Sequence, residues 1–156
     1  RDGWSRALMA GVAAIFVLSF GSCTACLFWA ATSPQGGVLT ANQLEPYAEE
    51  LIEQKGLVHD DERLLAFYDA TVSLDGSEVA IITDRAISYL RNDRVTRYEF
   101  SEIEDIEVSD DALGTGFTIV HESGERLVFS VSAYNGERLF AETLMDAWTR
   151  AYEPSP

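Results

Sequence analysis

Two cysteines, Cys23 and Cys26, have the spacing in this chain that is most suggestive of chemistry. In a soluble redox protein, the pattern C-x-x-C is typical of a reactive dithiol or of one half of a zinc site. No histidine directly follows Cys26 and the chain has no second cysteine pair, so neither haem attachment nor a four-ligand zinc site is predicted. Because both cysteines lie inside an apolar run, we interpret them as small residues of that run.

Two acidic groups offer carboxylates to a cation: Asp60-Asp61-Glu62, which follows His59, and Asp110-Asp111. Neither group has the alternating ligand spacing of a calcium loop, so we interpret both as solvated turns. The other histidine, His121, falls on a predicted strand without a Ser or Cys motif that it would activate. The sequence therefore predicts no metal ligand, no cofactor and no catalytic residue, and we expect a protein that is not an enzyme.

Three arginines, Arg91, Arg94 and Arg97, form a small basic group in a chain whose formal net charge is -15. A chain this acidic repels phosphate backbones, so nucleic acid is excluded as a partner. The three arginines could dock an acidic protein or lipid headgroups. They could equally balance the acids that lie near them, which are Asp84, Asp93 and Glu99.

An apolar run dominates the start of the chain, because the 26 residues from Ala7 to Thr32 include no Asp, Glu, Lys or Arg. The hydrocarbon core of a bilayer needs about 20 apolar residues in a helix, so this run predicts a single transmembrane helix. It is longer than the apolar part of a signal peptide, which has about 7 to 15 residues. Trp4, Arg6 and Trp29 are expected at the membrane interface, where indoles and basic groups are favourable.

The basic residues around the apolar run set its expected orientation. Arg1 and Arg6 precede the run, whereas the next basic residue after it is Lys55. Because basic flanks tend to stay in the cytoplasm, we expect a single-pass protein of the bacterial cytoplasmic membrane. The domain that follows the run would then lie on the periplasmic side.

Small residues recur at a spacing of four along the predicted membrane helix, which lets a second helix approach closely. They form the pairs Ala7 and Gly11, Ala10 and Ala14, and Gly21 and Ala25. Small residues are also common in membrane helices in general. The pattern is therefore compatible with packing against other membrane subunits or with an anchor that contacts only lipid.

The chain after residues 1–32 divides into a linker with an amphipathic helix at 33–59, one domain at 60–152 and a tail at 153–156. Apolar residues between Leu44 and Ile52 follow a helical period. Pro46 suits the first turn of that helix, and Gly56 suits its end. We expect this helix to pack between the anchor and the domain.

From residue 64 the hydrophobic period changes to that of strands. We predict seven strands, at 64–72, 77–83, 85–91, 94–99, 103–109, 116–121 and 125–131. Asp75-Gly76, Asn92-Asp93 and Ser123-Gly124 lie between them and are typical of hairpins, so the sheet is expected to be antiparallel. After Asn135, a predicted helix cap, apolar residues up to Ala151 form a helical stripe.

Two stretches of this region resemble those of bacterial pleckstrin-homology-like (PH-like) domains. Residues 81–89, IITDRAISY, resemble a strand junction with Thr and Arg, and residues 98–106, YEFSEIEDI, resemble a strand followed by an acidic-Ile-x-x-Ile passage. The resemblance covers residues 60–151 and implies an α+β, mainly β fold: a seven-stranded antiparallel barrel capped by a C-terminal helix. It also implies a binding scaffold without chemistry of its own.

Lipid-binding members of that family use Lys and Arg near the first hairpin. Here residues 71–78 contain two acids and no base, which speaks against a phosphoinositide pocket. We therefore expect a non-catalytic accessory or scaffolding subunit of a larger bacterial membrane complex, of the respiratory or photosynthetic type. The alternative is a membrane-tethered module that senses a lipid headgroup or a small ligand.

Overall fold

In the computed structural model, residues 36–152 are described, and they form one compact unit that begins at Gly36. The predicted transmembrane segment, its six helix-packing residues, the Cys23–Cys26 pair and the predicted interface residues Trp4, Arg6 and Trp29 all lie outside the described residues. Among residues 36–152, no helix is both long enough and apolar enough to cross a membrane.

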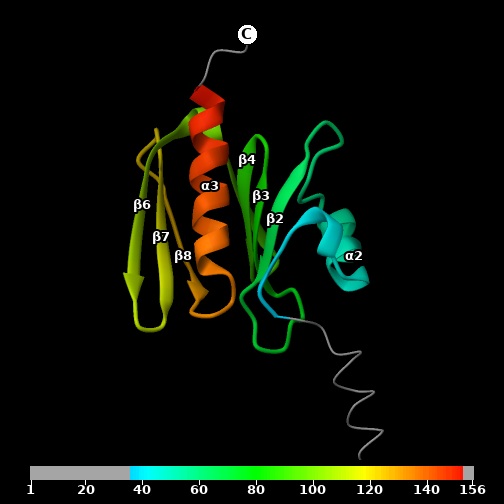
Figure 1. Cartoon of the computed structure of the whole chain (residues 1–156). Coiled ribbons are helices and arrows are strands. Elements are labelled where there is room, and N and C mark those ends of the chain that lie inside the picture. The colour runs from blue at the N-terminus through cyan, green and yellow to red at the C-terminus, as the bar shows by residue number, and fades with distance from the viewer. Residues whose placement is uncertain (1–35, 153–156) are drawn as a thin grey trace, which may run out of the picture. The chain divides into compact units, whose positions relative to one another are not determined.

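The first sheet contains five antiparallel strands in the order β1-β2-β3-β4-β5 (Figure 1). Their bounds are β1 Val38–Leu39, β2 Leu64–Asp69, β3 Glu78–Thr83, β4 Ala86–Arg91 and β5 Arg94–Glu99. Between β1 and β2 the chain forms the 3-10 helix η1 Ala41–Gln43 and the helix α2 Pro46–Lys55. As predicted, Pro46 lies in the first turn of α2, and Gly56 ends the helix with a left-handed backbone.

The second sheet contains three antiparallel strands in the order β6-β7-β8. Their bounds are β6 Ile103–Asp111, β7 Gly114–His121 and β8 Arg126–Ser132, and the 3-10 helix η2 Phe100–Glu102 separates β5 from β6. Burial alternates strictly along β8, so one face of this sheet lies on the core and the other faces solvent. The final helix, α3 Glu137–Tyr152, follows β8.

The predicted seven-stranded barrel is wrong. The seven predicted strands correspond to β2 through β8, but the described residues contain eight strands in two separate sheets of five and three. Between these sheets no strand pairing occurs within residues 36–152, because η2 turns the chain out of the first sheet around the buried ring of Phe100. Consequently β5 and β8 remain edge strands, which a closed barrel would have paired.

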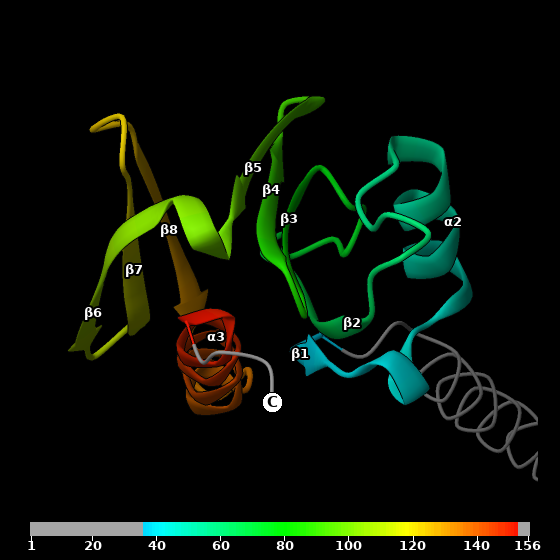
Figure 2. The ribbon, with the colours of Figure 1, turned by 90° about the horizontal axis from the view of Figure 1, so that it is seen from above.

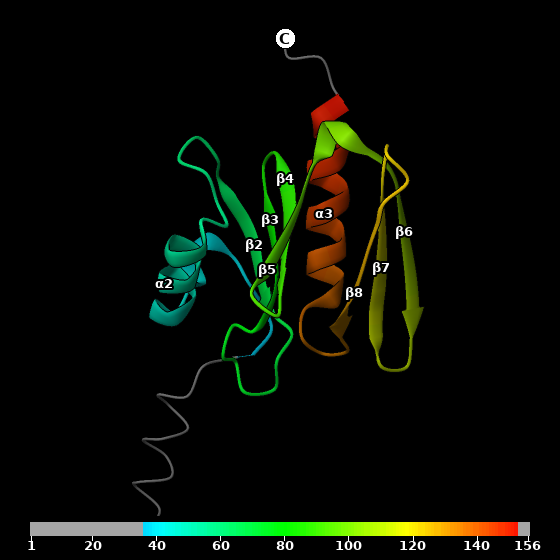
Figure 3. The same cartoon turned by 180° about the vertical axis from the view of Figure 1, so that it is seen from behind.

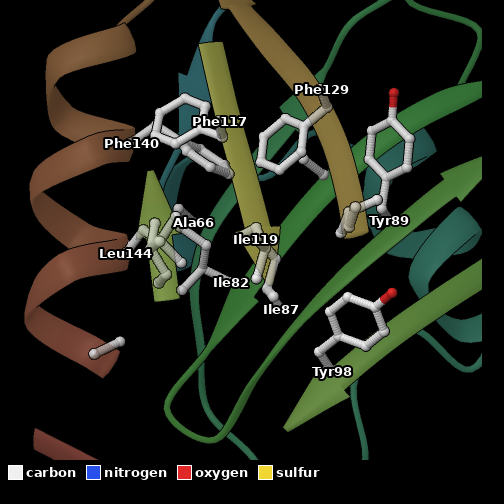
Figure 4. Close-up of a cluster of buried hydrophobic side chains, with 14 of the residues drawn as sticks. Ala66, Ile82, Ile87, Tyr89, Tyr98, Phe117, Ile119, Phe129, Phe140 and Leu144 are labelled. Atoms are coloured by element: carbon white, nitrogen blue, oxygen red, sulfur yellow. The ribbon is translucent and has the colours of Figure 1, made fainter. Parts of the chain in front are cut away.

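Helix α3 packs between the two sheets (Figure 2). Its apolar stripe buries Phe140, Leu144 and Ala147 completely or almost completely. The ring of Phe140 lies 5.4 Å from that of Phe117 and 5.8 Å from that of Phe129, and the three rings form the centre of the main core (Figure 4). Contacts of this kind between aromatic rings add to the gain from burial alone.

The helix α2 covers the opposite face of the first sheet (Figure 3). Ala48 of α2 and Leu57 after it pack against Phe67, Val79 and Ile81, and these residues form a second core cluster. The first sheet is therefore buried on both faces. This explains why β3 and β4 read as nearly continuous apolar runs rather than as alternating strands.

Candidate functional site

A cleft of about 560 Å³ lies between the β4–β5 hairpin and β8. Its lining residues lie on the β4–β5 hairpin and on the β7–β8 hairpin, and both hairpins are visible in Figure 2. Both walls end in edge strands, β5 of the first sheet and β8 of the second. The lining residues are Tyr89, Arg91, Asn92, Arg94, Thr96, Tyr98, Glu125, Arg126, Leu127 and Val128.

The β4–β5 hairpin places Arg91 and Arg94 directly opposite each other across a two-residue turn. The turn residues Asn92 and Asp93 have φ values of 52° and 61°, as a type I′ hairpin requires. The predicted turn is therefore confirmed. Paired residues of an antiparallel ladder project from the same face of the sheet, which brings both guanidinium groups to the cleft.

Arg97, the third predicted docking residue, does not line the cleft. It follows Arg94 by three positions, and an odd spacing on a strand reverses the face. Its side chain is 18% exposed, and its guanidinium group forms ion pairs with Glu62 and, at 2.9 Å, with Glu99. Burial lowers the pKa of Arg97, but hydrogen bonds to Glu99 and Glu62 outweigh burial and raise it. Arg97 thus fixes the α2–β2 loop to β5.

Arg126 is the third arginine of the cleft, and sequence reasoning missed it. It begins β8, far from Arg94 along the chain, and only the packing of the two sheets brings them together. Arg126 forms an ion pair with Glu107 at 2.9 Å, and Arg91 forms one with Glu78 at 3.8 Å. For Arg94, the described residues provide no ion-pair partner within 4.0 Å.

Two buried tyrosines, Tyr89 and Tyr98, line the cleft. Their hydroxyl groups point away from the Phe117–Phe129–Phe140 cluster (Figure 4). The hydroxyl of Tyr89 donates a hydrogen bond to Glu78, and burial followed by this bond raises the pKa of Tyr89 well above its usual range. Burial also raises the pKa of Tyr98. Both phenols therefore stay protonated and uncharged.

The predicted acidic groups make local contacts in the structure. Glu62 pairs with Arg97, and Asp61 pairs with Arg85. Asp110 accepts a 2.6 Å hydrogen bond from the Thr115 hydroxyl, and Asp111 accepts one of 2.6 Å from the backbone N–H of Leu113. In residues 36–152, no group of three or more His, Cys, Asp and Glu side chains is arranged to hold a metal ion.

His121 lies close to a hydroxyl that sequence reasoning did not consider. Its Nδ1 is 2.8 Å from Ser123 Oγ, and its Nε2 is 3.6 Å from a carboxylate oxygen of Glu102. The order Ser–His–Glu is that of a hydrolytic triad. However, the backbone N–H of Ser123 donates to the same Nδ1 at 3.1 Å, so the histidine accepts hydrogen bonds that close the β7–β8 turn. We interpret this arrangement as a turn contact.

Comparison with known proteins adds little to this geometry. No protein-family model matches the chain, and no curated protein matches it at a significant level. Among solved structures, one similar chain is the C-terminal domain of an unknown protein from Leishmania infantum, with 14% identity and a TM-score of 0.42. The match covers 65% of this chain and 94% of the other. At this TM-score the likeness supports no statement on fold or function.

Proposed function

We propose that the chain is a non-catalytic, membrane-anchored accessory subunit of a larger membrane-protein assembly. In this proposal, residues 7–32, which lie outside the described residues, provide the anchor, and the cleft binds an extended acidic segment of a neighbouring subunit. The observation that carries the proposal is the cleft itself, which gathers three arginines in a chain of net charge -15.

The charges of the cleft favour an acidic ligand. The side chains of Arg91 and Arg126 are 61% and 54% exposed, so their present ion pairs with Glu78 and Glu107 are weak surface pairs. A carboxylate of a partner can replace Glu78 or Glu107 in these ion pairs without leaving a buried charge unpaired. Arg94 needs no such exchange, because no described residue is paired with it. The planar guanidinium group of arginine suits bidentate binding of carboxylates.

The edge strands favour an extended protein segment over a compact small molecule. Both β5 and β8 end their sheets, so each has one side without a neighbouring strand. A peptide that lies in the cleft can add to such an edge through main-chain hydrogen bonds, while its side chains meet the arginines. The exposed edge strand β6 differs, because it carries a row of carboxylates that discourages strand addition. These are Glu104, Asp105, Glu107, Asp110 and Asp111.

Co-purification in mild detergent tests the proposal. We expect partner chains to co-purify with the wild-type protein and to be lost several-fold in the variant Arg91→Gln, Arg94→Gln, Arg126→Gln. The matched control replaces Arg85, Arg138 and Arg150 by Gln, which removes the same charge from exposed ion pairs outside the cleft. Undiminished co-purification of the cleft variant would contradict the proposal. An equal loss in both variants would show that net charge, and not the cleft, determines binding of the partner.

The second candidate function is recognition of an anionic headgroup by the same cleft. It is favoured by Arg94, which has no ion-pair partner among residues 36–152. Flotation of residues 36–156 with vesicles distinguishes the two functions. The fragment must keep residues 36–39, because β1 pairs with β2 through Val38 and Leu39. Binding that requires anionic lipid and disappears in the cleft variant would favour headgroup recognition. No binding in this assay would favour the accessory subunit.

A further inference from the structure

Three large apolar side chains protrude from one end of the domain, which we call the loop end. Val72 of the β2–β3 loop is fully exposed, Leu113 of the β6–β7 turn is 83% exposed, and Tyr134 of the β8–α3 loop is 99% exposed. The three loops lie together at the lower end of the domain in Figure 1 and again in Figure 3. Isolated exposed apolar residues are ordinary, but a group of them at one end is typical of an interaction surface.

The described chain begins at this same end. A Cβ at Gly36 would lie 3.8 Å from the side chain of Leu74, in the β2–β3 loop. Two residues later, the backbone N–H of Val38 donates a 2.7 Å hydrogen bond to the carbonyl of Asn135, beside Tyr134. The backbone N–H of Ala133 in turn donates to the carbonyl of Leu113 at 2.8 Å. Residues 36–38 thus contact the β2–β3 and β8–α3 loops, and the β8–α3 loop is in turn bonded to the β6–β7 turn.

Two residues of the same loops have an unusual backbone conformation. Among residues 36–152, four residues other than glycine have a positive φ, and Asn92 and Asp93 among them form the β4–β5 turn. The other two are Leu74, with φ of 49°, and Tyr134, with φ of 68°. An aromatic residue rarely adopts this conformation. The side chain of Tyr134 is almost wholly exposed, so its ring does not pack within the domain. Unusual backbone conformations of this kind are found preferentially at functional sites.

We propose that the loop end lies against the lipid bilayer, with Val72, Leu113 and Tyr134 inserted into its interfacial zone. This inference rests on the proposed function, because it takes residues 7–32 as the membrane anchor. From Thr32 to Gly36 the chain has four residue steps, which span at most about 14 Å when fully extended. Gly36 is therefore held within that distance of the end of the proposed anchor, and the β2–β3 loop lies beside Gly36 through Leu74.

The chemistry of the loop end selects the kind of lipid surface. Tyr suits the interface because its ring is apolar and its hydroxyl is polar. The acids nearby already have local partners: Asp75 accepts hydrogen bonds from Ser73 and Ser77, and Asp111 accepts them from Leu113 and Gly114. These carboxylates make the loop end acidic, so it is expected to prefer zwitterionic headgroups and to be repelled by anionic ones.

Depth measurement on the full chain in phosphatidylcholine vesicles tests this inference. With Cys23 and Cys26 replaced by Ser, a fluorescent label is placed at Ala112→Cys, beside Leu113. The matched control is Ser123→Cys, because residues 112 and 123 occupy the two turns of the same sheet at its opposite ends. We expect quenching by spin-labelled lipid to be several-fold stronger at 112 than at 123, and to weaken when phosphatidylglycerol is added. Equal quenching at the two positions would overturn the inference.

A second variant tests the three side chains themselves. Replacing Val72, Leu113 and Tyr134 by Ser should remove most of the lipid quenching at position 112. The control variant Val95→Ser changes an exposed apolar residue outside the three protruding loops and should leave the quenching unchanged. If the label at 112 is shielded from a water-soluble quencher but is not quenched by lipid, a protein covers the loop end and the inference is wrong.

The failure of this inference can be told apart from failure of the proposed function. If a carbonate wash removes the full chain from the vesicles, the anchor is wrong and the inference falls with it. If the chain is retained but the label at 112 shows no lipid quenching, the loop end faces away from the bilayer. In that case only this inference is overturned.

Discussion

Arg94 and Arg97 project from opposite faces of β5, although only two residues separate them. Arg94 faces the cleft between the sheets, and Arg97 is directed to the buried carboxylate of Glu62. One of the two is therefore available to a ligand, while the other holds the α2–β2 loop in place. The two arginines should respond to the same substitution in different ways.

Replacement of Arg97 by Gln should destabilise the domain by about 3 kcal/mol, because it leaves the Glu62 carboxylate buried and without its guanidinium partner. Arg94→Gln is the matched control, and we expect it to change the stability by less than about 0.5 kcal/mol. Urea unfolding of residues 36–156 measures both values. Equal effects of the two substitutions would contradict the distinct roles assigned here.

Gly114 and Gly124 provide a matched pair for backbone effects, because both have a positive φ and both adjoin a turn of the second sheet. A Cβ at Gly114 would lie 2.1 Å from the carbonyl oxygen of Val131, whereas one at Gly124 meets nothing within 4 Å. We expect Gly124→Ala to cost about 1 kcal/mol from conformation alone. Gly114→Ala adds a backbone clash and should cost about 3 kcal/mol or more. Thermal unfolding of the two variants checks this order, and a reversed order would refute it.

The carboxyl group of Asp75 should titrate unusually low. Hydrogen bonds from Ser73, and then from Ser77, lower its pKa to about 2. A carboxyl group whose pKa is lower in the folded state stabilises that state above its unfolded pKa of about 3.9. This contribution is lost as the pH falls from about 4 toward 2. An NMR titration of the Asp75 side chain measures the pKa directly, and Ser73→Ala should raise it. An ordinary value in the wild-type protein would show that the loop hydrogen bonds do not persist in solution.

Ser123 should be unreactive, despite its short contact with His121. We expect a fluorophosphonate probe to leave it unlabelled, because the contact belongs to the β7–β8 turn. Ser123→Ala should instead lower the stability by about 1 kcal/mol, the usual value for one hydrogen bond. Mass spectrometry after exposure to the probe checks the first outcome, and denaturant unfolding checks the second. Stoichiometric labelling of Ser123 would indicate an enzyme.

Local signals in the sequence predicted the individual elements well. Pro46 and Gly56 marked the two ends of α2, and Asn92-Asp93 marked a hairpin turn, because these residues act within a few positions of themselves. The sequence predicts Asn135 as the cap of the last helix, but α3 begins at Glu137, after Gly136. The carbonyl of Asn135 instead accepts a hydrogen bond from Val38, a residue far away in the chain.

Features that depend on distant residues were not predictable in this way. β1 has two residues, too few for any hydrophobic period, and it exists because β2 pairs with it. The separation into two sheets depends on η2, which buries Phe100 between them. No local sequence pattern predicts this burial. The cleft likewise lies between the β4–β5 hairpin and Arg126 of β8, which are far apart in the chain. Sequence proximity therefore grouped Arg97 with Arg91 and Arg94 in place of Arg126. The parity of the strand positions could have excluded Arg97 in advance.

Because the first sheet is buried on both faces, neighbouring residues of one strand belong to different core clusters. Ile81 belongs to the cluster under α2, and the next residue, Ile82, belongs to the cluster around α3. Removing α2 would expose the apolar face of the sheet beneath it, so this helix is a permanent cover for the domain. Proteolytic cleavage near residue 57 should therefore yield an insoluble product and not a shortened, functional domain. For the same reason, α2 and the rest of the domain should unfold together.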